Sequence, residues 1–170
     1  MAVSFQKGEY VKYASNGVCL IEDVSSLDFN PKAKDATYYI LRPLSTSSTT
    51  IFVPTDNELL LSRMRKLLTK EEIDAVIARI DTKNPDWPED RKERANLFGE
   101  IVKRDDPVEL LSLARAIYLR RAELNAKGKK LMATDGNVLE QIERLVENEF
   151  TFVLDITPAE VNEYIKKKMN

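Results

Sequence analysis

The sequence predicts an α+β protein in which the strands come first and the helices follow. Apolar residues repeat with a period of 2 up to about residue 66, and with a period of 3.6 from there on. The chain of 170 residues is 43% hydrophobic and 32% charged, a composition typical of a globular protein with a core. We therefore expect two domains: residues 1–66 as a small Tudor- or SH3-like β-barrel, and residues 67–170 as an all-α helical bundle.

Short strands separated by turn residues make up the predicted first domain. Residues 9–14 alternate in polarity, and Asn16-Gly17 predicts a two-residue hairpin turn because both residues tolerate a positive φ. Further strands are predicted at 18–24, 37–43 and 49–54. The Ser/Thr-rich stretch before the last strand is interpreted as a hairpin loop. Several such strands in about sixty residues favour a small, strongly bent sheet or barrel.

Capping residues mark the helices of the predicted second domain. Thr69, followed three residues later by Glu72, forms a predicted capping box in which each side chain binds a backbone N–H. The other predicted helices begin at Pro88, at Asp106-Pro107, at Val138 and at Thr157-Pro158. The helix from Val138 is expected to run to Phe150, and the apolar residues 150–155 after it fit either a helix or a strand.

The residue types that are missing exclude most catalytic chemistry. The chain has no histidine and a single cysteine. Imidazole bases, Ser-His and Cys-His pairs, His-ligated metals and Cys-cluster zinc sites are therefore excluded. We interpret Cys19 as a small buried hydrophobe in a reducing cytosol. Five scattered glycines form no phosphate-binding loop. We expect a protein that is not an enzyme and that uses no cofactor, metal or small-molecule substrate.

Charge is balanced overall but uneven along the chain. The net charge is −2, yet residues 91–130 hold 11 basic and 6 acidic residues, a net charge of +5. The flanking segments 67–90 and 131–170 each carry a net charge of −4. The opening segment Met1–Lys7 lacks the apolar run of a signal peptide, and no stretch is long and apolar enough to cross a bilayer. We therefore expect a cytoplasmic protein with no membrane partner.

Trp87 is the only tryptophan and lies between two prolines in Asn84-Pro85-Asp86-Trp87-Pro88. One interpretation is structural, with the indole filling a helix–helix junction. The other is an exposed wedge that enters a DNA base step while neighbouring cations hold phosphates. The basic residues that would contact phosphate in this second interpretation are Arg91, Lys92, Arg94, Arg120, Arg121, Lys127, Lys129 and Lys130. Solvated helix faces would explain the same charges without DNA.

Several short motifs occur in an order that matches a known family. In the first domain they are Phe5-Gln6-Lys7-Gly8-Glu9-Tyr10-Val11, Tyr38-Tyr39-Ile40-Leu41-Arg42 and Ile51-Phe52-Val53-Pro54. In the second domain they are Asp86-Trp87, Arg94-Ala95-Asn96-Leu97, Ala114-Arg115-Ala116-Ile117-Tyr118-Leu119-Arg120 and Gly128-Lys129-Lys130-Leu131-Met132. Over roughly residues 3–150 the chain resembles the CarD-like (CarD/CdnL) bacterial transcription regulators. Their N-terminal module also occurs in the transcription-repair coupling factor.

The resemblance implies a promoter factor without catalytic activity. Its Tudor-like domain would dock on the β subunit of bacterial RNA polymerase through Ile40, Phe52 and Pro54. Its helical domain would make weak minor-groove contacts with promoter DNA at the upstream edge of the transcription bubble and so stabilise the open complex. The DNA-contacting residues carried over to this sequence are Trp87, Arg91, Lys92, Lys129 and Lys130. We expect a monomer that is associated with the nucleoid through polymerase.

One departure from the family pattern lies directly after the tryptophan. Family members usually place a basic pair two or three residues after it, whereas here Pro88-Glu89-Asp90 precedes Arg91 and Lys92. The two acids would repel phosphate. The alternative function is therefore a polymerase- or protein-binding adaptor whose helical domain does not contact DNA.

Overall fold

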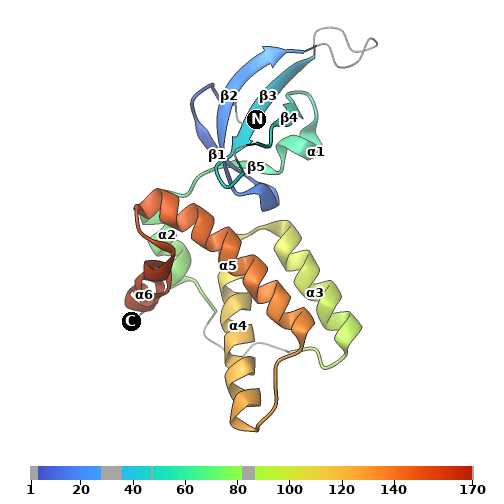
Figure 1. Ribbon diagram of the computed structural model, residues 1–170, viewed down its shortest axis with the longest axis vertical. Coiled ribbons are helices and arrows are strands. Elements are labelled where there is room, and N and C mark those ends of the chain that lie inside the picture. The colour runs from blue at the N-terminus through green and yellow to red at the C-terminus, as the bar shows by residue number, and fades with distance from the viewer. Residues whose placement is uncertain (1–3, 28–35, 47, 82–86, 170) are drawn as a thin grey trace. The chain divides into compact units, whose positions relative to one another are not determined.

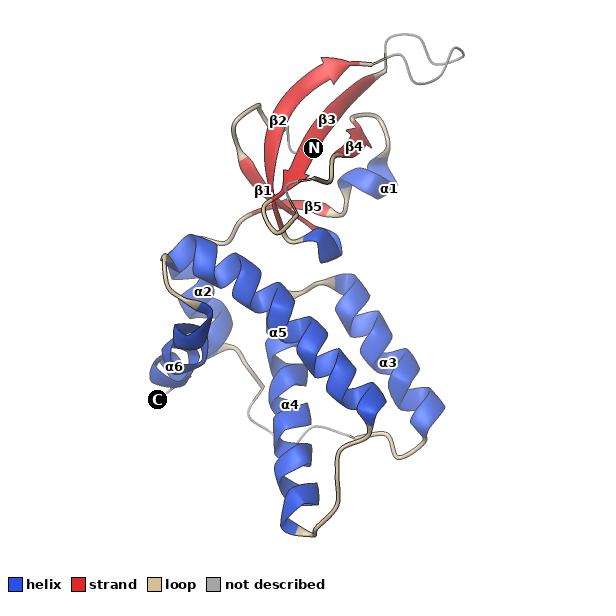
Figure 2. Ribbon diagram, viewed as in Figure 1, coloured by secondary structure: helices blue, strands red, loops and turns tan. Residues whose placement is uncertain are grey.

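The computed structural model describes residues 4–27, 36–46, 48–81 and 87–169 (Figure 1). The chain divides into two compact units, residues 1–67 and residues 68–170. Within the described residues, the first unit holds all the strands and the second consists of helices and their connections (Figure 2). The predicted α+β class is therefore confirmed.

Five antiparallel strands form the sheet of the first unit. They are β1 (Tyr10–Tyr13), β2 (Val18–Ser26), β3 (Thr37–Pro43), β4 (Ile51–Pro54) and β5 (Met64–Lys66). Their order in the sheet is β4-β3-β2-β1-β5. Since β4 and β5 are the two edges in the described residues, the sheet is open and the predicted closed barrel is not confirmed. Strand β5 and the one-turn helix α1 (Glu58–Leu61) were not predicted, because each is too short to show a period.

The connection between β1 and β2 differs from the predicted two-residue turn. A turn of 3-10 helix, η1 (Ala14–Asn16), follows β1, and the N–H of Tyr13 donates to the carbonyl of Gly17 at 3.0 Å. Both ends of this connection have a positive φ, 44° at Ala14 and 72° at Gly17. The Asn-Gly pair therefore marks the correct hairpin, but the loop is longer because the left-handed residues stand at its two ends.

The core of the first unit lies on one side of the sheet. Side chains at alternate positions of β3 and β4 turn inward, so Tyr39, Leu41 and Val53 are buried. Phe5, Cys19 and Met64 belong to the same cluster. Burial raises the pKa of the Cys19 thiol to about 11. The thiol is fully inaccessible, which confirms that Cys19 is a buried hydrophobe.

Five helices make up the second unit. They are α2 (Lys70–Ala78), α3 (Arg91–Arg104), α4 (Pro107–Ala126), α5 (Ala133–Leu154) and α6 (Pro158–Met169). The predicted capping box is present, with the Thr69 hydroxyl accepting from the Glu72 N–H at 3.1 Å and Glu72 accepting from the Thr69 N–H at 2.8 Å. Among the described residues, no helix has the length and apolar character needed to cross a membrane.

Two helix bounds differ from the prediction. Helix α3 begins at Arg91 rather than at Pro88, because the Asp90 carboxylate caps it by accepting from the Glu93 N–H at 2.8 Å. Helix α5 begins five residues before Val138 and continues to Leu154. The apolar residues after Phe150 are therefore its last turn, and Asp155 ends the helix in the left-handed conformation at φ 53°.

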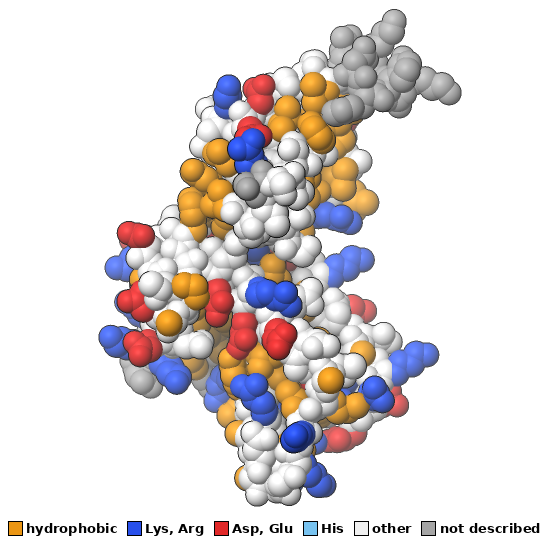
Figure 3. Space-filling view, viewed as in Figure 1, with side chains coloured by type: hydrophobic (Ala, Val, Ile, Leu, Met, Phe, Trp, Pro, Cys, Tyr) orange, Lys and Arg blue, Asp and Glu red, His pale blue; other side chains and the backbone are white. Residues whose placement is uncertain are grey.

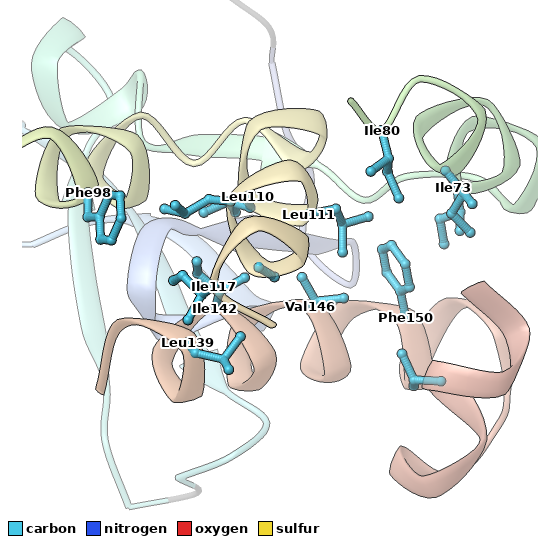
Figure 4. Packing of buried hydrophobic residues seen from close by; sticks show 14 residues of the cluster. Ile73, Ile80, Phe98, Leu110, Leu111, Ile117, Leu139, Ile142, Val146 and Phe150 are labelled. Carbon is cyan, nitrogen blue, oxygen red and sulfur yellow. The ribbon is translucent and has the colours of Figure 1, made fainter. Parts of the chain in front are cut away.

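The core of the second unit lies mainly between α4 and α5. Figure 4 shows the side chains of these helices meeting there, with Phe98 of α3 at one end and Ile73 of α2 at the other. Helix α6 packs beside α2 and α5 and contributes Val161 to the core (Figure 1). Its Tyr164 hydroxyl donates to the Asp74 carboxylate of α2 at 2.5 Å. The pairing of α6 with α2 gives the last helix a structural role that the sequence did not define.

Candidate polymerase and nucleic-acid surfaces

The three residues predicted to contact polymerase lie on one face of the sheet. In the β3–β4 register, Ile40 is opposite Phe52 and Tyr38 is opposite Pro54. Their neighbours Tyr39 and Val53 point into the core, so these four side chains lie on the opposite side. We call Tyr38, Ile40, Phe52 and Pro54 the β3–β4 face. Tyr38 is not among the residues predicted from the sequence, but its even spacing from Ile40 places it on the same face of the strand.

The β3–β4 face is apolar and partly open to solvent. Phe52 is 41% exposed, and Ile40 and Pro54 are partly buried. Arg42 continues the same side of β3 and forms an ion pair with Glu22 at 2.5 Å. The face thus has a charged border toward β2. Because β4 is an edge strand of the described sheet, a partner strand that pairs with it would lie directly beside Phe52.

The tryptophan of the helical unit is partly buried rather than fully exposed. Trp87 packs against the helical core and meets Phe98 of α3 edge to face, with the ring centroids 5.4 Å apart and the planes at 71°. The guanidinium carbons of Arg94 and Arg120 lie 5.1 Å and 5.6 Å from the Trp87 ring centroid. These distances allow cation–π contact. Within the described chain, the cations that lie over the indole are therefore Arg94 and Arg120.

Arg94 connects the tryptophan segment to the helical core. Its Nε and Nη2 donate to the two carboxylate oxygens of Asp135, each at 3.0 Å, and its Nη1 donates to the carbonyl of Pro88 at 2.9 Å. The side chains of Arg94 and Asp135 are only 5% and 6% exposed. A buried, bidentate pair of this kind fixes the position of the residue that follows Trp87. No sequence pattern indicated this pairing, because Arg94 lies in a basic run that resembles a solvated face.

Both acids after Trp87 have local partners. Asp90 caps α3, as described above, and the Glu89 carboxylate lies 3.5 Å from the Arg120 guanidinium. Arg120 also pairs with Glu123 at 3.5 Å. Asp90 therefore serves to begin α3, and Glu89 serves to hold an arginine near the indole.

The predicted phosphate-contacting residues gather at one end of the helical unit. In Figure 1 the starts of α3 and α5 lie side by side, and α4 extends beyond them before the chain turns back to α5. Arg91 and Lys92 are exposed in the first turn of α3, and Lys129 and Lys130 are exposed between α4 and α5. Figure 3 shows several separate basic side chains in this region, with uncharged and acidic groups between them. We call this end, with Trp87 and these four cations, the Trp87 end.

A groove of about 420 Å³ lies elsewhere on the helical unit, between α4, α5 and α6. Its walls are mostly apolar, and Tyr118 and Glu143 lie at its side, with the Tyr118 hydroxyl donating to the Glu143 carboxylate. Burial and this carboxylate raise the pKa of Tyr118 to about 12. Burial and Glu143 also raise the pKa of Glu147. The groove therefore holds a neutral phenol and two carboxylates that repel each other.

Comparison with known proteins assigns the first unit to a family. Residues 5–67 match the family model of the CarD-like/TRCF RID domain. No curated protein matches the chain. The match spans the five-stranded sheet and its β3–β4 face and ends where the helical unit begins. The resemblance of the helical unit to CarD-like regulators stays a prediction. Residues 5–67 are therefore a domain of the CarD-like/TRCF RID family.

Proposed function

We propose that this protein is a promoter factor that docks on the β subunit of bacterial RNA polymerase and stabilises the open complex. The observation that carries the proposal is the RID domain at residues 5–67, whose family interacts with the polymerase β subunit and is in general non-enzymatic. The exposed Phe52 on the edge strand β4 of the described sheet supports docking by strand addition through the β3–β4 face.

The DNA-contacting part of the proposal concerns the Trp87 end. Trp87 enters the minor groove at the upstream edge of the bubble. Unstacking a base step costs less there, because the DNA is already distorted where the strands separate. Arg91, Lys92, Lys129 and Lys130 contact the phosphates and are supported in this role by their exposure around one end of the unit. Tethering to polymerase raises the local concentration, so a monomer with a net charge of −2 needs only weak DNA affinity.

A second function is favoured by the packing of Trp87. Its ring touches Phe98, Arg94 and Arg120, and these contacts would also suit a purely structural tryptophan. In that case the protein is a polymerase-binding adaptor whose helical unit does not contact DNA. A photo-crosslinker at Lys92 distinguishes the two functions: crosslinks to upstream promoter DNA in the polymerase complex support the promoter factor, and their absence supports the adaptor.

Polymerase binding is tested with the full chain and purified polymerase. We expect Phe52→Glu to weaken binding by at least about tenfold, because it places an unpaired charge in an apolar contact. Leu59→Glu is the matched control, since Leu59 is an exposed apolar residue of the same unit outside the β3–β4 face. Equal affinity of wild type and Phe52→Glu would mean that polymerase binds another surface.

A further inference from the structure

The two arginines beside Trp87 differ in how firmly they are held. The Arg94 side chain is only 5% exposed and donates five hydrogen bonds, three of them to Asp135 and Pro88 at 3.0 Å or less. The Arg120 side chain is 29% exposed, and both of its acidic partners are well exposed, Glu89 at 79% and Glu123 at 62%. Arg94 is therefore a fixed part of the core, whereas Arg120 is an outer contact.

The contacts that keep Arg120 near the indole are weak. Its distances to Glu89 and Glu123 are both 3.5 Å, and neither pair is bidentate. Exposed ion pairs of this kind contribute little to stability, because water and salt screen them. A guanidinium binds a phosphate group more strongly than it binds a single carboxylate oxygen in an exposed pair. The reason is that phosphate offers several charged acceptors in a geometry that fits the guanidinium fork. A nearby DNA phosphate would therefore compete well with Glu89.

We propose that Arg120 is a removable cover over Trp87, held in place by Glu89, which opens when a DNA phosphate replaces Glu89 as the partner of the guanidinium. The inference rests on the proposed function and adds a control step to it. In the free protein the cover limits the access of solvent and other molecules to the indole. At the promoter, a DNA phosphate binds Arg120 and moves it off the indole. The same contact holds the DNA backbone next to Trp87 as the indole enters the minor groove.

The ion pair with Glu89 determines how readily the Arg120 side chain leaves the indole. It belongs to the acidic stretch that separates this chain from the family pattern, and it faces the arginine that any approaching phosphate must capture. Glu89→Gln removes both the competing charge and a repulsion of phosphate. We therefore expect this variant to favour DNA contact, but only while Arg120 is present to accept the phosphate.

The free protein provides a test that needs no DNA, because Trp87 is the only tryptophan and reports alone in fluorescence. We expect the acrylamide quenching constant to rise about twofold in Arg120→Met, because the cation over the ring is lost. Arg115→Met is the matched control, since Arg115 lines the groove between α4, α5 and α6. Raising NaCl from about 0.05 M to about 0.5 M is expected to increase quenching in wild type and not in Arg120→Met. An unchanged quenching constant in Arg120→Met would contradict the proposal that Arg120 covers Trp87.

Open-complex lifetimes test the exchange with phosphate. Glu89→Gln is expected to lengthen the lifetime and Arg120→Met to shorten it, and Glu89→Gln is expected to have no effect in the Arg120→Met background. Equal effects of Glu89→Gln in both backgrounds overturn the exchange. If Arg120→Met changes quenching while even Trp87→Ala leaves the lifetime unaltered, the cover exists in the free protein, and it is the proposed DNA function that fails.

Discussion

Breaking the buried ion pair between Arg94 and Asp135 is expected to lower the stability of the helical unit strongly. Asp135→Asn keeps the size of the side chain but removes its charge, so the Arg94 guanidinium is left buried without a counter-ion. Both side chains are nearly inaccessible, at 5% and 6% exposure, so water does not replace the lost partner. Removing one partner of such a pair costs about 3 kcal/mol or more. That is a large share of the roughly 5–15 kcal/mol that stabilises a domain.

Thermal unfolding followed by circular dichroism at the helical band measures this cost. For a unit of this size, about 3 kcal/mol corresponds to a fall in Tm of roughly 12 °C or more. The double variant Arg94→Met with Asp135→Leu removes both charges, and we expect it to recover most of the loss, because an apolar pair of similar volume needs no solvation. If Asp135→Asn lowered the free energy of unfolding by less than about 1 kcal/mol, the reasoning would be refuted.

Three further predictions concern the helical unit. Ile117→Ala should lower the free energy of unfolding by about 3 kcal/mol in a denaturant titration, because Ile117 is fully buried between α4 and α5. Asp90→Ala should cost about 1 kcal/mol through loss of the α3 cap, measured in the same way. The raised pKa of Glu147 means that its neutral form is favoured in the fold, so its stabilising effect is lost as the pH rises through the unfolded and then the folded pKa. Glu147→Gln should therefore raise Tm by about 1–2 °C at pH 7 and leave it unchanged near pH 3 in thermal melts, because it removes a like-charge pair one turn from Glu143.

Local signals in the sequence predicted most of the fold. The period-2 pattern placed β3 at residues 37–43, its bounds in the structure, and the capping box at Thr69 placed the start of α2. Helix α5 was wrong at both ends for one reason. Packing outweighs local propensity at both ends: Asp135, just before Gly136, is buried in its pair with Arg94, and Phe150 is buried in the core. Tertiary packing therefore decided what the local pattern left open.

The candidate surfaces were predictable to different degrees. Alternation along β3 and β4 brought Ile40 and Phe52 together, since register follows from the strand pattern. The surroundings of Trp87 were not predictable in the same way. Arg94 and Asp135 are 41 residues apart in the chain, and no periodicity connects residues of different helices. A basic residue that serves a buried pair has the same local signature as one that faces solvent.

The lifetime of the open complex tests the central claim most directly. It is measured on a housekeeping promoter with purified bacterial polymerase, with and without the protein, and with Trp87→Ala and the control Leu97→Ala, an exposed apolar residue of α3. The account predicts a longer lifetime with wild type and Leu97→Ala and no lengthening with Trp87→Ala, while all three still bind polymerase. An unchanged lifetime with polymerase-bound wild type would contradict it.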